Sequence, residues 1–185
     1  MPDTTLLLMD VQNGIVARLG DGAGPLLDTV GRAAAAARAA GLPVIYVRVA
    51  FRPGGHEINP RNRVFAALAG STAMGLDDPA TQIHPAVAPA PDDAVVVKKR
   101  VSAFTGSDLD VVLRSCGAAS LVLAGIATSG VVLSTLRQAA DLDFDLTVLR
   151  DACADQDPEL HTVLMEKVFP RQATVTTTDE WTARL

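Results

Sequence analysis

The stretch "LVLAGIATSGVVLST", Leu121–Thr135, decides the fold. It begins as an apolar strand, breaks at Gly125, and continues after Thr128 with the spacing of a helix. In many α/β enzymes a nucleophilic side chain lies at such a strand-to-helix turn, where backbone N–H groups can bind a developing oxyanion. The first helical turn here offers Gly130, Val131 and Val132, and none of these side chains is a nucleophile.

Apolar strands alternate with helical segments on both sides of this stretch. This alternation predicts a parallel sheet with helices on both faces. We therefore expect one α/β domain over residues 1–185, a three-layer, doubly wound and mostly parallel sheet. Residues 51–91, which hold most of the prolines, are expected to be irregular. The expected strands cover residues 4–10, 42–50, 93–99, 119–125, 144–152 and 172–181, and the expected helices cover 24–41, 107–117, 129–143 and 157–169.

The composition excludes several classes of partner. The chain has 16 basic and 21 acidic residues and no basic stripe, so we expect no nucleic-acid partner. No apolar run is long enough to span a membrane, and we expect no membrane partner. The N-terminal "MPDTTLLLMD" lacks the basic region of a signal peptide, which predicts a cytoplasmic location.

Charged residues follow two of the expected strands. Ligands of parallel sheets bind outside the carboxyl ends of the strands, near the point where strand order reverses. Asp10 ends the first strand, a position that suits either a turn cap or a catalytic carboxylate. Lys98 and Lys99 end the third strand, and because strand side chains alternate, one can face the site and the other solvent. The lysine pair is equally typical of an ordinary charged strand end.

The cysteines and histidines give little sign of chemistry. Cys116 and Cys153 are expected to be reduced and to pack as small apolar residues, because no neighbouring base or helix N-terminus is identifiable that would activate them. His56, His84 and His161 are too scattered for a metal cluster.

Four motifs in order resemble the isochorismatase-like hydrolase superfamily, also called the cysteine hydrolases. They are "LLLMDVQNG", "VVVKKRVSAFTGSDLDVVLR", "LVLAGIATSGVVLSTLRQAADLDF" and "VLRDACADQDPELH". The resemblance covers almost the whole chain. It implies that Asp10 is the catalytic aspartate and Lys98 the catalytic lysine, with Lys99 pointing outward. It also implies that the nucleophile position, six residues after Gly125, is occupied by Val131.

A valine has no lone pair, so no thioester intermediate can form at that position. The resemblance includes one branch without the cysteine, the isochorismatases, which hydrolyse a vinyl ether without a covalent intermediate. We therefore expect a hydrolase of a small, anionic metabolite that works by acid-base chemistry and water attack. Two alternatives stay open: a catalytically silent small-molecule binder or oligomeric scaffold, and a hydrolase in which Cys153 or Ser129 is a displaced nucleophile.

The resemblance implies further features of the site. It predicts a non-proline cis peptide near Ile126–Ala127, and backbone groups of the turn around Thr128 and Gly130 aimed into the pocket. It also predicts a homodimer or homotetramer, no cofactor, and no metal, because "FRPGGHEINP" supplies too few metal ligands. Guanidinium groups suit a substrate carboxylate. The residues that we expect to bind substrate are Gln12, Phe51, Arg52 and Arg100.

Overall fold

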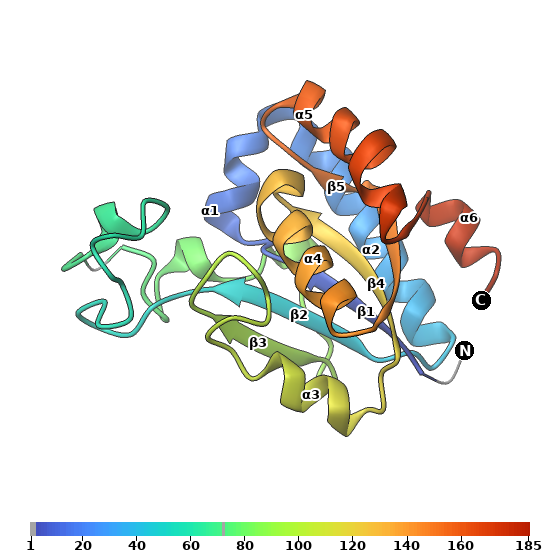
Figure 1. Cartoon of the computed structure of the whole chain (residues 1–185), viewed down its shortest axis with the longest axis horizontal. Coiled ribbons are helices and arrows are strands. Elements are labelled where there is room, and N and C mark those ends of the chain that lie inside the picture. The colour runs from blue at the N-terminus through green and yellow to red at the C-terminus, as the bar shows by residue number, and fades with distance from the viewer. Residues whose placement is uncertain (1–2, 72) are drawn as a thin grey trace.

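The computed structural model describes residues 3–71 and 73–185. At its centre is a sheet of six strands, all paired in parallel, in the order β3-β2-β1-β4-β5-β6 (Figure 1). The expected doubly wound α/β fold is therefore confirmed. The strands are β1 (Thr4–Met9), β2 (Val44–Val49), β3 (Ala94–Lys98), β4 (Ser120–Ile126), β5 (Asp145–Ala154) and β6 (Thr174–Thr176).

Helices cover both faces of this sheet, with α2 and α4 on opposite sides (Figure 1). No helix within residues 3–71 and 73–185 is both long and apolar enough to cross a membrane. The α-helices are α1 (Asn13–Val16), α2 (Ala23–Ala39), α3 (Leu109–Ser115), α4 (Leu133–Asp141), α5 (Pro158–Val163) and α6 (Thr178–Thr182). Short turns of 3-10 or π helix are η1 (Ala17–Gly22), η2 (Ala66–Leu68), η3 (Pro79–Thr81), η4 (Pro85–Val87), η5 (Thr128–Val132), η6 (Leu164–Val168) and η7 (Phe169–Arg171).

Strand β1 shows why the sequence forms a sheet covered on both faces. All six of its residues are buried. Leu6 and Leu8 pack on the side of α2, whereas Leu7 and Met9 pack on the side of α3 and α4. A strand that is buried on both faces needs a continuous apolar run rather than an alternating pattern, and "TTLLLM" supplies one.

The strand order reverses between β1 and β4, where the chain proceeds to β2 on one side of β1 and to β4 on the other. The two backbones approach closely at the carboxyl end of this pair. Gly125 lies opposite Met9, and a Cβ added to Gly125 would lie 2.1 Å from the Met9 carbonyl oxygen. The break that the sequence places at Gly125 thus marks a position where no side chain fits.

The region after β2 is irregular, as expected, with only the short turns η2, η3 and η4. Part of it forms a protruding lobe at the left of Figure 1, which we call the Phe51 lobe (residues 51–75, of which 72 lies outside the description). Phe51 and Phe65 meet edge to face in this lobe, with ring centroids 5.3 Å apart. Together with Val49 and Ile58 they form a small apolar core of its own.

The C-terminal strand prediction is wrong in its extent. The expected strand over residues 172–181 is limited to β6, and the helix α6 follows at once. Thr177 and Glu180 form a capping box that starts this helix. Trp181 on α6 is buried against the α2 side of the sheet, so packing overrides the β-branched composition of the segment.

Candidate active site

Asp10 lies directly after β1, at the point where the strand order reverses. Its backbone N–H donates to the Val47 carbonyl oxygen at 2.8 Å, which extends the β1–β2 pairing by one residue. Its φ angle is 58°, a left-handed conformation that aspartate tolerates better than most residues. The turn directs the carboxylate into the protein, where the side chain is only 7% exposed.

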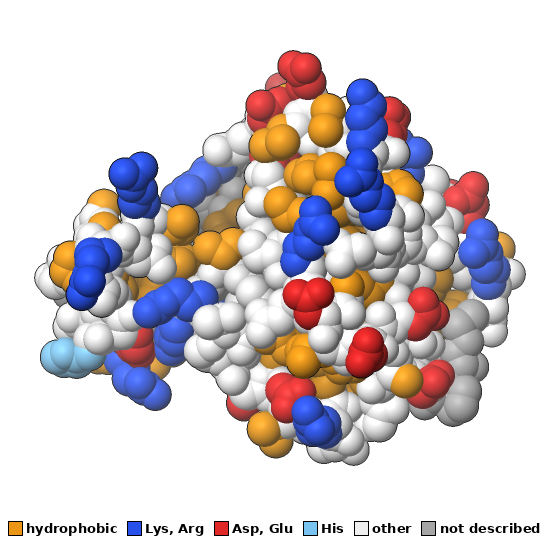
Figure 2. Space-filling model, in the orientation of Figure 1, with side chains coloured by type: hydrophobic (Ala, Val, Ile, Leu, Met, Phe, Trp, Pro, Cys, Tyr) orange, Lys and Arg blue, Asp and Glu red, His pale blue; other side chains and the backbone are white. Residues whose placement is uncertain are grey.

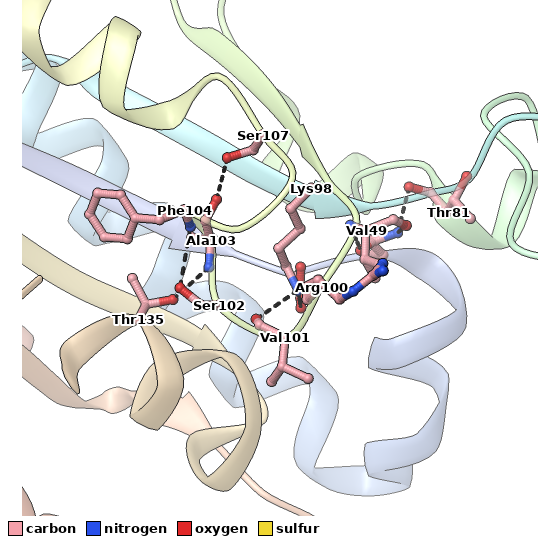
Figure 3. Close-up of polar contacts among 12 residues, drawn as sticks. Val49, Thr81, Lys98, Arg100, Val101, Ser102, Ala103, Phe104, Ser107 and Thr135 are labelled. Atoms are coloured by element: carbon pink, nitrogen blue, oxygen red, sulfur yellow. Dashed lines mark hydrogen bonds and ion pairs between the residues drawn. The ribbon is translucent and has the colours of Figure 1, made fainter. Parts of the chain in front are cut away.

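Lys98, the last residue of β3, is the partner of this carboxylate. Its Nζ lies 2.9 Å from Asp10 Oδ2. The same ammonium donates to the carbonyl oxygens of Arg100 and Val101, each 3.0 Å away (Figure 3). An ammonium has three hydrogens, so all of its donors are occupied. Lys98 is thus built to hold Asp10 in place and to balance its charge.

The second carboxylate oxygen of Asp10 has a different environment. Oδ1 is buried and has no hydrogen-bond partner. Burial raises the pKa of Asp10 to about 6, although the Lys98 charge and its hydrogen bond pull the pKa down. An unpartnered buried oxygen costs stability, about 1–3 kcal/mol. A buried carboxyl that titrates near neutral pH is a candidate for proton transfer.

The turn after β3 anchors this pair to α4. The Ala103 N–H donates to Thr135 Oγ1 at 2.9 Å, and Ser102 Oγ donates to Gln138 Oε1 at 2.7 Å (Figure 3). Ser107 Oγ closes the turn on the Ala103 carbonyl at 2.6 Å. The "SAF" part of the second motif therefore connects the end of β3, which carries Lys98, to the helix that follows the Val131 turn.

The Val131 turn follows β4. The peptide bond Ile126–Ala127 is cis, as expected, and residues Thr128–Val132 form a π-helical turn. The Val131 side chain is 2% exposed and packs in the core on the side of α3 and α4. The Gly130 N–H donates to the Ala127 carbonyl at 3.1 Å, so this backbone donor is occupied within the turn.

Two residues that the sequence analysis did not select hold this turn from the side of α5. Thr128 Oγ1 is 2.8 Å from His161 Nδ1, and the Ser129 N–H donates to Asp155 Oδ2 at 2.7 Å. Burial lowers the pKa of His161, opposed by the charge of Asp155. Both residues lie in or near the fourth motif, "VLRDACADQDPELH", and that motif was the available signal.

The fold and this geometry agree with comparisons to known proteins. A family model described as the isochorismatase domain matches residues 4–180. The chain belongs to the isochorismatase family. Its relatives include the isochorismatase family protein YecD of Escherichia coli O157:H7, which is 35% identical over 180 residues, 96% of this chain and 93% of YecD. Ureidoacrylate amidohydrolase RutB of Pseudomonas syringae pv. syringae is 36% identical over 180 residues, 85% of this chain and 73% of RutB.

Solved structures of the isochorismatase family give the same result. An isochorismatase family protein from Burkholderia thailandensis superposes with a TM-score of 0.88 at 32% identity, over 99% of this chain and 95% of that one. N-carbamoylsarcosine amidase from Thermoplasma acidophilum has a TM-score of 0.76 at 26% identity, over 95% of this chain and 96% of that one. The resemblance that the four motifs predicted is confirmed at the level of the family.

The four residues expected to bind substrate lie in different environments in this family member. Gln12 is buried, and its amide bonds the backbone of Val49 and Thr81 at 2.8–2.9 Å, which ties β2 to η3. Phe51 is buried in its own lobe. The Arg100 guanidinium donates to the carbonyl oxygens of Lys99 and Glu57. These three side chains therefore have structural contacts in this conformation.

Arg52 is 70% exposed at its side chain and lies 3.4 Å from Glu57 Oε1. The hollows that it lines also contain Lys99, which points away from the Asp10 pair. The expected separation of the two lysines onto opposite sides is observed, because Lys98 is buried against Asp10 while Lys99 donates to the Ala50 carbonyl. Arg52 accompanies Lys99 rather than Lys98.

Neither cysteine has the environment of a nucleophile. Cys153 is buried in the core, and burial raises the pKa of its thiol to about 12. Cys116 is half-buried at the end of α3, 3.7 Å from Thr5 Oγ1. Within residues 3–71 and 73–185, no three His, Cys, Asp or Glu side chains come together as metal ligands.

Proposed function

We propose that this isochorismatase-family chain is a hydrolase of a small, anionic metabolite, in which Asp10 transfers protons and water is the attacking group. The observation that carries the proposal is the buried, unpartnered Oδ1 of Asp10, on a carboxyl whose pKa is raised to about 6. Its other oxygen is held by Lys98, which leaves Oδ1 as the atom available for a reacting group.

The chemistry requires no covalent intermediate on the protein. With an amide or carbamoyl substrate, the Asp10 carboxylate accepts a proton from water while the water oxygen bonds to the carbonyl carbon. Asp10 then returns that proton to the leaving nitrogen as the C–N bond breaks. With a vinyl ether, protonated Asp10 donates its proton to the vinyl carbon, water adds to the oxocarbenium carbon, and a water proton restores Asp10. Lys98 holds the carboxyl in one orientation in both cases.

Two considerations support a carbamoyl or vinyl-ether substrate. RutB is named as an amidohydrolase of ureidoacrylate, and the Thermoplasma neighbour as an amidase of N-carbamoylsarcosine. Both names describe small acids with a carbamoyl group. Val131 stands where the family resemblance places the nucleophile, and this favours bonds that water can break once an acid or base assists it.

The test is a panel of ureido acids, amides and vinyl ethers with wild type, Asp10→Asn and Asp21→Asn. Asp21 is an exposed carboxylate on η1 and serves as the matched control. We expect Asp10→Asn to lose at least about 100-fold in kcat/KM, the usual contribution of a positioned acid-base group. Asp21→Asn should keep wild-type turnover. Equal turnover by all three proteins would remove Asp10 from the mechanism.

A catalytically silent small-molecule binder is the second candidate, and one observation favours it. Asp10 Oδ1 and the Val131 side chain are both buried, so a substrate reaches them only when covering residues move. A silent protein would show no turnover across the panel while a panel compound raised its melting temperature. Turnover that depends on Asp10 would exclude this candidate.

A further inference from the structure

A hollow lies at the carboxyl end of β3 on the side of Lys99. Its volume is about 430 Å³, and a second hollow of about 530 Å³ adjoins it and shares Arg52, Lys99 and Gly106. Val95 and Val97, which alternate with Lys98 along β3, line the second hollow. The two hollows therefore lie on the opposite side of β3 from Lys98 and its partner Asp10. The first hollow is lined by Arg52, Glu57, Lys99, Arg100, Thr105 and Gly106.

The lining of the first hollow carries an excess of positive charge. Three cations, Arg52, Lys99 and Arg100, face one carboxylate, Glu57, although the chain as a whole has a net charge of −5. Figure 2 shows basic side chains predominating on the protruding lobe at the left, which borders this region. A local excess of one sign in a hollow concentrates ions of the opposite sign.

The geometry leaves donors free for a ligand. The Lys99 ammonium uses one of its three hydrogens on the Ala50 carbonyl at 2.6 Å. The Arg52 guanidinium has one ion-pair contact, with Glu57 at 3.4 Å, and is largely exposed. Arg100 donates to two backbone carbonyls, so it adds charge and fixes the wall of the hollow.

Lys99 behaves as a cation that lacks sufficient neutralisation. Burial lowers the pKa of its ammonium, Glu57 opposes this, and the charges of Arg52 and Arg48 lower it further. Gly106 makes room for the lysine stem, since an added Cβ would lie 2.9 Å from Lys99 Cβ. A half-buried lysine beside two arginines is stabilised by a bound anion.

We propose that this hollow is a binding site for a phosphate group, supplied either as the free ion or as the phosphate of a small phosphorylated metabolite. The Arg52 fork and the Lys99 ammonium hold the phosphate oxygens, and a dianion matches the excess of two positive charges. The volume of the hollow leaves space beside the phosphate for an organic part. This site is separate from Asp10 and does not depend on the proposed hydrolase activity.

The test is calorimetric titration with inorganic phosphate and with ribose 5-phosphate, against potassium chloride at the same ionic strength. Wild type, Lys99→Met, Arg52→Gln and Arg61→Gln are compared. Arg61 is exposed on the same lobe and lines neither hollow, so it is the matched control. We expect saturable binding with a Kd below about 1 mM, at least tenfold weaker in Lys99→Met and fivefold weaker in Arg52→Gln, and unchanged in Arg61→Gln.

The two ligands distinguish the sources of the phosphate. Tighter binding of ribose 5-phosphate identifies a phosphorylated metabolite, and equal or weaker binding identifies the free ion. No saturable binding of either ligand, unchanged binding in Lys99→Met, or equal weakening in Arg61→Gln would overturn the proposal. If Lys99→Met fails to fold by circular dichroism, Arg52→Gln decides, because its exposed side chain can be replaced without disturbing the core.

Discussion

Lys98 and Lys99 are neighbours in the sequence and lie in opposite environments. Lys98 is 2% exposed at its side chain, is paired with a carboxylate, and has every donor occupied. Lys99 is half-buried, has one carbonyl partner, and lies among other cations. Strand alternation alone separates them, because consecutive side chains point to opposite faces.

The difference shows what burial does to a charge. On the Lys98 side, the protein encloses an ion pair and leaves one carboxylate oxygen unpartnered, an arrangement suited to proton transfer. On the Lys99 side, solvent reaches the ammonium, and the neighbouring cations make the hollow attractive to anions. One dipeptide thus contributes to two sites of different chemistry.

The largest expected effect concerns the close approach of β1 and β4 beside Asp10. Gly125→Ala would place a Cβ 2.1 Å from the Met9 carbonyl oxygen, so one of the two central strands must move. We expect a loss of more than about 5 kcal/mol in the free energy of unfolding, or a chain that does not fold. Urea unfolding measures it.

Gly130→Ala is the matched control, because its added Cβ would meet only Ala127 Cβ at 3.8 Å, an ordinary contact. Its stability should stay within about 1 kcal/mol of wild type. Similar losses in both variants would show that the close approach at Gly125 is unimportant.

A second prediction compares the two lysines directly. Lys98→Met removes one partner of a buried ion pair and should cost about 3–5 kcal/mol at pH 8, where Asp10 is ionised. At pH 5 the cost should be smaller, because Asp10 is then mostly protonated, given its pKa of about 6. Lys99→Met should change stability by less than about 1 kcal/mol at either pH. Equal costs for the two variants would contradict the contrast between their environments.

Much of the fold could be predicted from local sequence, and the exceptions have physical causes. The apolar run of β1 and the positive φ of Gly41 just after α2 are set by nearby residues. The helix α6 was predicted as strand because its β-branched residues favour a strand locally. Burial of Trp181 against the sheet, which no local pattern reveals, decides for the helix.

The candidate site divides in the same way. The pairing of Asp10 with Lys98 follows from two strand ends that share one edge of the sheet, together with the family resemblance. The contacts of Gln12 and Arg100 are with carbonyl oxygens of residues 37 and 43 positions away, respectively, so the sequence could not show that these side chains are occupied. His161 meets Thr128 only because α5 packs against the Val131 turn.

A third prediction uses the pH dependence of stability. In the folded protein the Asp10 pKa is raised, so protonation of Asp10 favours the native state. The contribution is fully present below pH 3.8 and is lost as the pH rises through about 6. Because each pH unit in that interval is worth about 1.4 kcal/mol, wild type should lose about 3 kcal/mol relative to Asp10→Asn between pH 4 and pH 7. Parallel pH curves of the two proteins, measured by urea unfolding, would show that Asp10 titrates normally.

The smallest expected effect separates water attack from a displaced thiol nucleophile. At pH 7 a thiol with a pKa of about 12 has almost no thiolate, and Cys153 lies in the core with its Sγ 4.0 Å from the Leu123 carbonyl oxygen. Cys153→Ala should therefore keep kcat within about twofold of wild type, like the control Cys116→Ala, on any substrate that the panel identifies. The same samples can be quenched during turnover and weighed by mass spectrometry. An acyl adduct on Cys153, or loss of turnover in Cys153→Ala alone, would mean that the core opens during catalysis. The buried Asp10–Lys98 pair would then act on a thiol rather than on water.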